Sequence, residues 1–219
     1  LIEPTSGSVL INEQDFLSLQ NAELVDARRN IQMIFQDPFG SLNPSQTVGY
    51  MITRGLLLQG VPGAKAWSRA IELLEQVGLE EAAMKRKPIS FSGGQRQRIG
   101  IARALSLQPD VVVADESVSA LDLSVQKQVL RLMSDLQTQY QMAIIFITHD
   151  LRVAAQISDY IAVMEKGLIV EFGSDAEIFN NTQHEYTKKL IDAAPGQDWS
   201  PPRLTREEAA RISEELKAF

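Results

Sequence analysis

Two short apolar runs, Val111–Ala114 and Ala143–Ile147, constrain the fold more than any other feature of the sequence. Each has the length of a strand and lacks polar alternation, which is typical of strands buried in a parallel sheet. Between them, Ser124–Tyr140 places apolar residues at helical spacing. This strand–helix–strand order predicts an α/β fold with a parallel-sheet core.

Composition narrows the function classes. Of the 219 residues, 44% are hydrophobic and 22% are charged, which indicates a globular chain. The net charge of −7 disfavours nucleic acid as a partner. Cysteine is absent, which excludes disulfides, zinc–cysteine sites and cysteine-ligated iron–sulfur clusters. No apolar run approaches the roughly 18 residues of a membrane-spanning helix.

The stretch 38–108 is predicted to be mostly helical and to form an inserted subdomain. Further periodic segments complete a coarse map of the chain. We expect helices at 48–59, 64–77, 93–106 and 150–157, strands at 8–12 and 31–35, and a hairpin of 160–164 with 168–171 around Lys166-Gly167. Prolines after residue 180 mark a linker before a last helix at 205–217, where Thr205 and Glu208 have capping-box spacing.

Two carboxylates, Asp115 and Glu116, follow the first apolar strand. Ligands of α/β proteins lie at the carboxyl ends of parallel strands. There, an aspartate can hold Mg²⁺ through water, and a glutamate can orient or deprotonate an attacking water. The alternative is a strand that simply ends in solvated acids.

The segment Phe91–Gln95 precedes a predicted helix, and Ser92 is suited to be its N-cap. The glycine pair would let a phosphate approach the backbone, where the helix N-terminus offers free N–H groups. Arg96 and Arg98 add positive charge. The alternative is an ordinary turn before a helix.

Taken in order, these motifs resemble the nucleotide-binding subunit of an ATP-binding-cassette (ABC) transporter. The matching positions are Gln36, Phe91–Gln95, Val111–Glu116, Ser119–Asp122 and Thr148–Asp150. The resemblance implies ATP and Mg²⁺ as cofactors, Glu116 as the catalytic base and His149 as the switch histidine that contacts the γ-phosphate. It implies Gln36 and Asp115 near the metal. The implied nucleotide-binding residues are Gln36, Ser92, Gly93, Gly94, Gln95 and Asp122.

Two segments narrow the resemblance to the oligopeptide/dipeptide importer group. They are the loop 36–44, and the tail that begins with Gln183–Thr187. Glu185 stands where that group usually has proline, and Ser117 replaces the usual proline after the catalytic glutamate. Some members carry an iron–sulfur cluster in this tail, which a chain without cysteine cannot hold.

The fold that this implies is a partial P-loop NTPase fold with an inserted helical signature subdomain and a C-terminal extension. We expect a RecA-like core at 1–37 and 109–180, the helical subdomain at 38–108 and the extension at 181–219. No Gly-x-x-x-x-Gly-Lys-Ser/Thr occurs in the sequence. We therefore expect an N-terminally truncated cassette that exposes a sheet edge and apolar surface, and that binds and hydrolyses MgATP poorly alone.

The expected function is that of an ATPase subunit powering import of peptides or similar small solutes. Its implied partners are a second ABC ATPase subunit, transmembrane permease subunits and, indirectly, a solute-binding protein. The implied location is the cytoplasmic face of the inner or plasma membrane, as a peripheral protein. Two alternatives stay open, an ABC ATPase acting on DNA or ribosomes and a degenerate or regulatory fragment. The segment 205–219 would pack on its own domain or serve as a dimer or regulatory contact.

Overall fold

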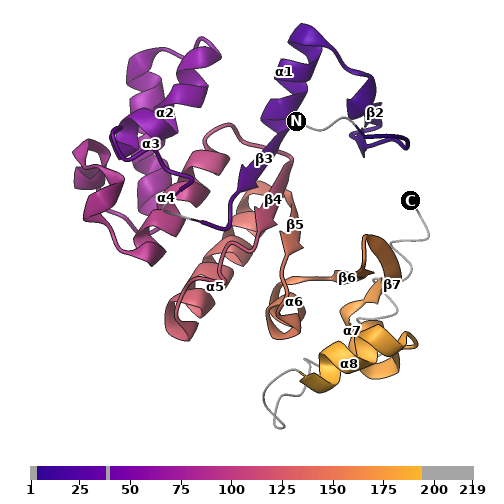
Figure 1. Ribbon diagram of the computed structural model, residues 1–219. Coiled ribbons are helices and arrows are strands. Elements are labelled where there is room, and N and C mark those ends of the chain that lie inside the picture. Colours follow the sequence, from indigo (N-terminus) through magenta and orange to yellow (C-terminus); the bar gives the residue numbers. More distant parts are fainter. Residues whose placement is uncertain (1–3, 38–39, 194–219) are drawn as a thin grey trace. The chain divides into compact units, whose positions relative to one another are not determined.

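The computed structural model describes residues 4–37 and 40–193 (Figure 1). It divides into two compact units, Leu1–Ile147 and Thr148–Phe219, each of which is described by itself. The predicted last helix at 205–217 lies outside the described residues.

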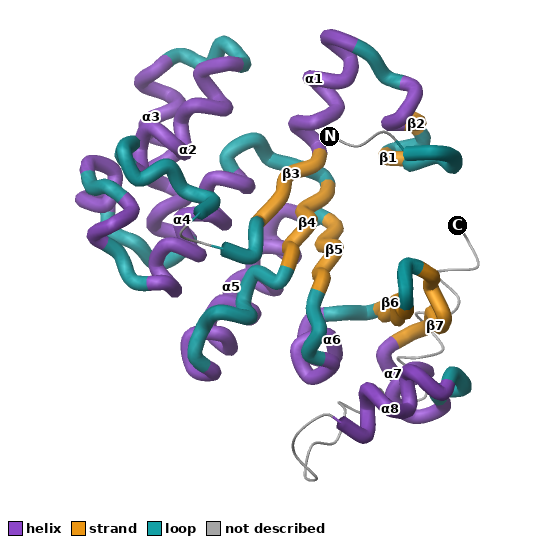
Figure 2. Tube along the Cα trace, viewed as in Figure 1, coloured by secondary structure: helices purple, strands orange, loops and turns teal. Residues whose placement is uncertain are grey.

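The first unit is built on a sheet of three parallel strands, seen in orange in Figure 2. The strand β4 (Val111–Asp115) lies between β3 (Ile31–Ile34) and β5 (Ala143–Ile147). Both pairings are parallel and continuous, with Met33 opposite Val113. This confirms the predicted α/β fold with a parallel sheet.

The helices between β3 and β4 gather in one group (Figure 1). They are α2 (Val48–Leu58), α3 (Gly63–Gln76) and α4 (Gly93–Leu105), with the short 3₁₀ helices η2 (Glu81–Lys85) and η3 (Pro88–Ser90). Apolar residues at helical spacing bury one face of each helix against the others. Fully buried members of this core are Ile52, Leu73, Leu74, Met84 and Ile99. The helices predicted within 38–108 are therefore confirmed.

The sheet is covered unevenly. The side chains of Ile34, Val112 and Ala114 are buried, and α4 packs against both β3 and α5 (Leu123–Tyr140). On the opposite face, Ile145 is 55% exposed and Ile147 is 46% exposed. The prediction that 143–147 is a buried strand was therefore wrong. Within the described residues β5 is an edge strand of this sheet.

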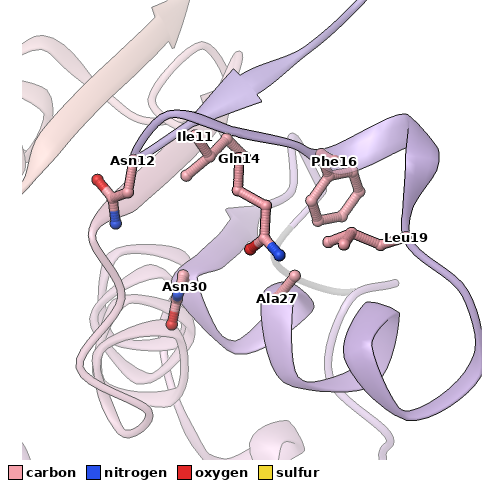
Figure 3. Close-up of a pocket in the computed structure, with 7 residues that line it drawn as sticks. All are labelled: Ile11, Asn12, Gln14, Phe16, Leu19, Ala27 and Asn30. Atoms are coloured by element: carbon pink, nitrogen blue, oxygen red, sulfur yellow. The ribbon is translucent and has the colours of Figure 1, made fainter.

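A small hairpin precedes this sheet. The strands β1 (Leu10–Ile11) and β2 (Gln14–Asp15) pair through Asn12 and Glu13, which both have positive φ, and η1 (Phe16–Ser18) follows. This shortens the strand predicted at 8–12. The hairpin and α1 (Asn21–Asn30) line a hollow of about 40 Å³, into which Gln14 points (Figure 3). That volume suits water and is far too small for a nucleotide.

The second unit has its own core. It contains α6 (Leu151–Ile157), β6 (Tyr160–Glu165), β7 (Leu168–Ser174), α7 (Asp175–Asn181) and α8 (Glu185–Ala193). The predicted hairpin is confirmed, with Lys166 and Gly167 at positive φ. Buried residues of α6, β6 and α7 form the core, and α8 packs on it through Tyr186 and Leu190.

A carboxylate joins β7 to the start of α8. Glu171 accepts hydrogen bonds from the Thr182 hydroxyl at 2.7 Å and from the Gln183 amide at 2.7 Å. Burial by itself would raise the pKa of Glu171, but the hydroxyl of Thr187 and these two donors lower it to about 2. Glu171 therefore holds the entry to α8 as an anion.

We expect α8 to detach from the hairpin in acid. The folded-state pKa lies below the ordinary 4.5, so this stabilisation is complete above pH 4.5 and is lost as the pH falls towards 2. Hydrogen exchange of the α8 amides between pH 6 and 2.5 should show protection falling with pH. Glu171→Gln should lower that protection already at pH 6 and flatten its pH dependence. Glu165→Gln on the same hairpin is the control, and equal behaviour of the two variants would contradict the assignment.

Candidate functional site

The candidate site lies where β3 and β4 end. Glu116 directly follows β4 and adopts a left-handed φ of 42°, which is strained for a residue with a side chain. Its backbone N–H donates to the Ile147 carbonyl at 2.9 Å, and its carbonyl accepts from the Ser119 hydroxyl at 2.9 Å. The Gln36 amide, just beyond β3, donates to the Glu116 carboxylate at 2.6 Å. The structure thus brings two predicted site residues from neighbouring strands into direct contact.

The predicted metal residues fit a magnesium site completed by phosphate. Asp115 shares its side of β4 with Val113, and it precedes the glutamate that Gln36 contacts. Among the described residues no group of three or more His, Asp or Glu side chains could hold an ion by itself. Mg²⁺ in phosphate-handling sites is commonly held by only one or two protein oxygens, with water and phosphate as the other ligands. Asp115 and the Gln36 amide are suitable donors of this kind.

The second predicted element is the N-terminus of α4. Ser92 caps this helix as expected, since its hydroxyl accepts from the Gln95 amide at 3.3 Å. The Ser92 backbone N–H donates to the side-chain oxygen of Gln95 at 3.0 Å, which completes a capping box. The amides of Gly93 and Gly94 then stand at the end of the helix that carries partial positive charge. This geometry suits an anion.

Packing gives a second reason for the glycine at position 94, and the sequence does not reveal it. A Cβ on Gly94 would stand 2.5 Å from a methyl group of Val125, whereas one on Gly93 would meet Leu121 at an ordinary 3.7 Å. Gly94 is therefore required by the close approach of α4 to α5, whatever binds in front of it.

Asp122, predicted to bind nucleotide, is the N-cap of α5. Its carboxylate accepts from the amides of Val125 at 3.0 Å and Ser124 at 3.1 Å. The Val125 bond, followed by the Ser124 side chain, lowers the pKa of Asp122. The carboxylate thus stabilises the start of α5, beside the glycines of α4.

His149 is exposed and lies in the second unit, between β5 and α6. Its neighbour Asp150 caps α6 and pairs with Arg152 at 2.7 Å, a bond that lowers the pKa of Asp150. The switch role of His149 stays a prediction, because the two units are described separately.

A groove of about 440 Å³ opens beside the candidate site, and Phe35, directly before Gln36, is one of its walls. The groove is mostly apolar, with Arg54 and Arg103 as its cations. Arg103 donates to the Ser41 carbonyl at 2.6 Å, and burial lowers its pKa. Its lining comes from α2, from β3 and the residue that follows it, and from the end of α4 and the two residues beyond: Gln32, Met33, Phe35, Met51, Arg54, Gly55, Leu58, Arg103, Ala104, Ser106 and Leu107.

Comparison with known proteins gives one consistent result. Residues 1–119 match the family described as ABC transporter. A glutathione import ATP-binding protein, GsiA, of Pectobacterium atrosepticum is 46% identical over 98% of this chain. A Brucella ovis protein named for peptide import and ATP binding is 47% identical over 90% of it. This chain spans 34% of the first relative and 63% of the second.

Solved structures agree with the sequence comparison. The ATP-binding cassette MJ0796, in a dimeric post-hydrolysis state bound to ADP and Pi, has a TM-score of 0.70 and 30% identity. The similarity covers 80% of this chain and 75% of that one. A second dimeric structure of MJ0796 gives a TM-score of 0.69. The predicted partial P-loop NTPase fold is thereby confirmed.

Gly94→Ala should destabilise the first unit by about 1–3 kcal/mol, because the new methyl group would overlap the stiff Val125 side chain. Urea unfolding would measure this loss. Gly93→Ala is the matched control and should change the free energy of unfolding by less than about 0.5 kcal/mol. Adding Val125→Ala to Gly94→Ala should restore part of the loss, and a simple sum of the two single effects would contradict the contact.

Proposed function

The chain belongs to the ABC transporter family, and on that premise we propose that it is the ATP-binding and ATP-hydrolysing part of an importer. The observation that carries this proposal is the 2.6 Å bond between Gln36 and Glu116, at the carboxyl edge of the parallel sheet. This is the edge at which α/β proteins bind ligands. A carboxylate held there by an amide is suited to orient a water molecule towards a phosphate.

The proposed cofactors are ATP and Mg²⁺, and each residue has a proposed task. Glu116 is the general base, and Asp115 holds the metal through water with Gln36 as a neighbouring oxygen donor. Mg²⁺ would neutralise phosphate charge when bound. His149 would contact the γ-phosphate as the switch histidine.

A second ATPase subunit is the proposed partner for the N-terminus of α4. There Ser92, Gly93, Gly94 and Gln95 would contact the γ-phosphate of ATP held mainly by that subunit, and Asp122 would lie at the same junction. The position of these residues at the N-terminus of α4 supports this arrangement, because that end of the helix carries partial positive charge and the amides of Gly93 and Gly94 belong to its first turn. The dimeric cassettes of the structural relatives support a pair as the working unit.

The groove beside Phe35 is the proposed contact with transmembrane permease subunits. Its apolar walls and two arginines suit an amphipathic helix, and its position next to Gln36 would link permease movement to the ATP site. A solute-binding protein would act indirectly through the permease. Among the described residues, no helix has the length and hydrophobicity to cross a membrane. The proposed location is the cytoplasmic face of the inner or plasma membrane, as a peripheral subunit.

The proposed solutes are peptides or similar small molecules such as glutathione. The names of the relatives from Pectobacterium and Brucella support this class. The loop 36–44 and the tail that begins at Gln183 point to the same importer group.

The 219-residue chain by itself should bind MgATP poorly, because its sequence contains no P-loop to cradle the phosphates. Isothermal calorimetry with MgATP should give no detectable heat of binding up to millimolar nucleotide. A chimera with the P-loop segment of a family member placed ahead of Leu1 is the positive control and should bind. Tight, Mg²⁺-dependent binding by the unmodified chain would mean that another element replaces the P-loop.

Glu116→Gln in that chimera should abolish turnover while ATP binding persists, because the amide keeps the shape and loses the base. A loss of at least a hundredfold in kcat is expected from a missing general base, measured as phosphate release. Glu165→Gln is the control that removes a carboxylate elsewhere. Retained turnover would exclude Glu116 as the base.

A further inference from the structure

The segment that leads into the Ser92 cap is held by two arginines. It contains η3 and Phe91, and its three successive carbonyls at 88, 89 and 90 all accept hydrogen bonds from guanidinium groups. No residue of the resemblance motifs supplies these bonds. Such a concentration of cationic donors on one short stretch of backbone needs an explanation beyond the helix cap.

Arg96 reaches the segment from the first turn of α4. Its Nε donates to the Pro88 carbonyl at 2.8 Å, and its Nη2 donates to the Ile89 carbonyl at 3.3 Å. The residue is only 8% exposed, so these bonds form largely away from water. Arg96 lies one helical turn beyond Ser92. Its bonds therefore fix the distance between the segment and the helix that Ser92 starts.

Arg86 holds the segment from the other end. Its Nη2 donates to the Ser90 carbonyl at 2.7 Å, and its Nε donates to the Ser90 hydroxyl at 3.2 Å. Its guanidinium also stacks over the Phe91 ring at 4.3 Å. This combination of a planar donor fork and ring stacking is available to arginine and not to lysine.

We propose that Arg86 and Arg96, here called the arginine pair, are positioning residues for the anion-binding end of α4. They bind the carbonyls of 88–90, so that these three acceptors face cationic donors and the segment that ends in the Ser92 cap is held in one place. A carbonyl aimed at that phosphate would repel it. The arginine pair acts through Ser92, Gly93 and Gly94 and does not touch the nucleotide. This inference rests on the proposed function for its consequence in turnover, and on the contacts above for its geometry.

The first test is hydrogen exchange on the unmodified chain and on Arg96→Met, which keeps an unbranched apolar stem and removes the guanidinium donors. The positioning role expects about tenfold faster exchange at the amides of 90–96, with unchanged exchange in α5. Unchanged exchange at 90–96 would overturn the proposal, and so would faster exchange spread evenly through α5. If Arg96→Met does not fold, Arg86→Lys carries the same test with the same expected pattern.

The second test is turnover of the P-loop chimera, which separates positioning from binding. Arg96→Met and Arg86→Lys should each lower kcat about tenfold with little change in the KM for ATP, because the misplaced α4 end fails in the transition state. Arg96→Lys should restore at most part of the loss, since a single ammonium group lacks the planar fork that bonds two neighbouring carbonyls. Arg29→Lys, on α1, is the matched control, because its exposed ion pair with Asp26 lies outside the helical group. Full activity in Arg96→Met would overturn the proposal.

The two tests distinguish the proposals. If the unmutated chimera has no turnover, the proposed function fails while hydrogen exchange still decides whether the arginine pair orders the segment. If the unmutated chimera turns over ATP but the arginine variants exchange like the unmodified chain, the arginine pair has no positioning role.

Discussion

The parallel pairing of β4 between β3 and β5 is the constraint on which the candidate site depends. It places the end of β3, with Gln36, beside the end of β4, with Asp115 and Glu116. It also brings the Ile147 carbonyl of β5 to the Glu116 amide, which holds that residue in its left-handed conformation. A shift of one residue in either pairing would turn these side chains to the opposite face of the sheet.

The helical group depends on a different kind of link to the rest of its unit. Arg98 on α4 donates to the carbonyl of Val77, which directly follows α3, at 2.7 Å. It also donates to the side chain of Gln128 on α5 at 3.3 Å. Tyr140 at the end of α5 accepts from Arg69 at 2.9 Å and donates to Gln76 at 2.6 Å. These polar links join α3 and α4 to α5 at separate points, whereas Gly94 joins α4 to α5 by close packing. The helical group is therefore held to α5 both by hydrogen bonds and by close packing.

Much of this arrangement is predictable from the sequence, and the exceptions have physical causes. The apolar run of β4, the periodicity of α5 and the Ser92 cap are local signals, and all three are confirmed. The helix α1 was missed because it buries none of its residues and so carries no apolar periodicity. The capping box of Ser174 and Glu177 could have identified α7. Two contacts depend on tertiary packing that no local pattern encodes. They are the close packing of Gly94 against Val125 and the hydrogen bond from Arg96 to the Pro88 carbonyl.

The uncovered face of the sheet connects stability to the candidate site. Alternation along β4 places Asp115 on the same face as Val113, and in register with them lie Met33 of β3 and Ile145 and Ile147 of β5. Parallel sheets are stable when both faces are covered, and full burial of one large aliphatic side chain contributes about 1.5–3 kcal/mol. A surface that packed on this face would bury Ile145 and Ile147 and would lie close to Asp115 at the carboxyl edge. Binding of a ligand at that edge and stability of the sheet would then be thermodynamically linked.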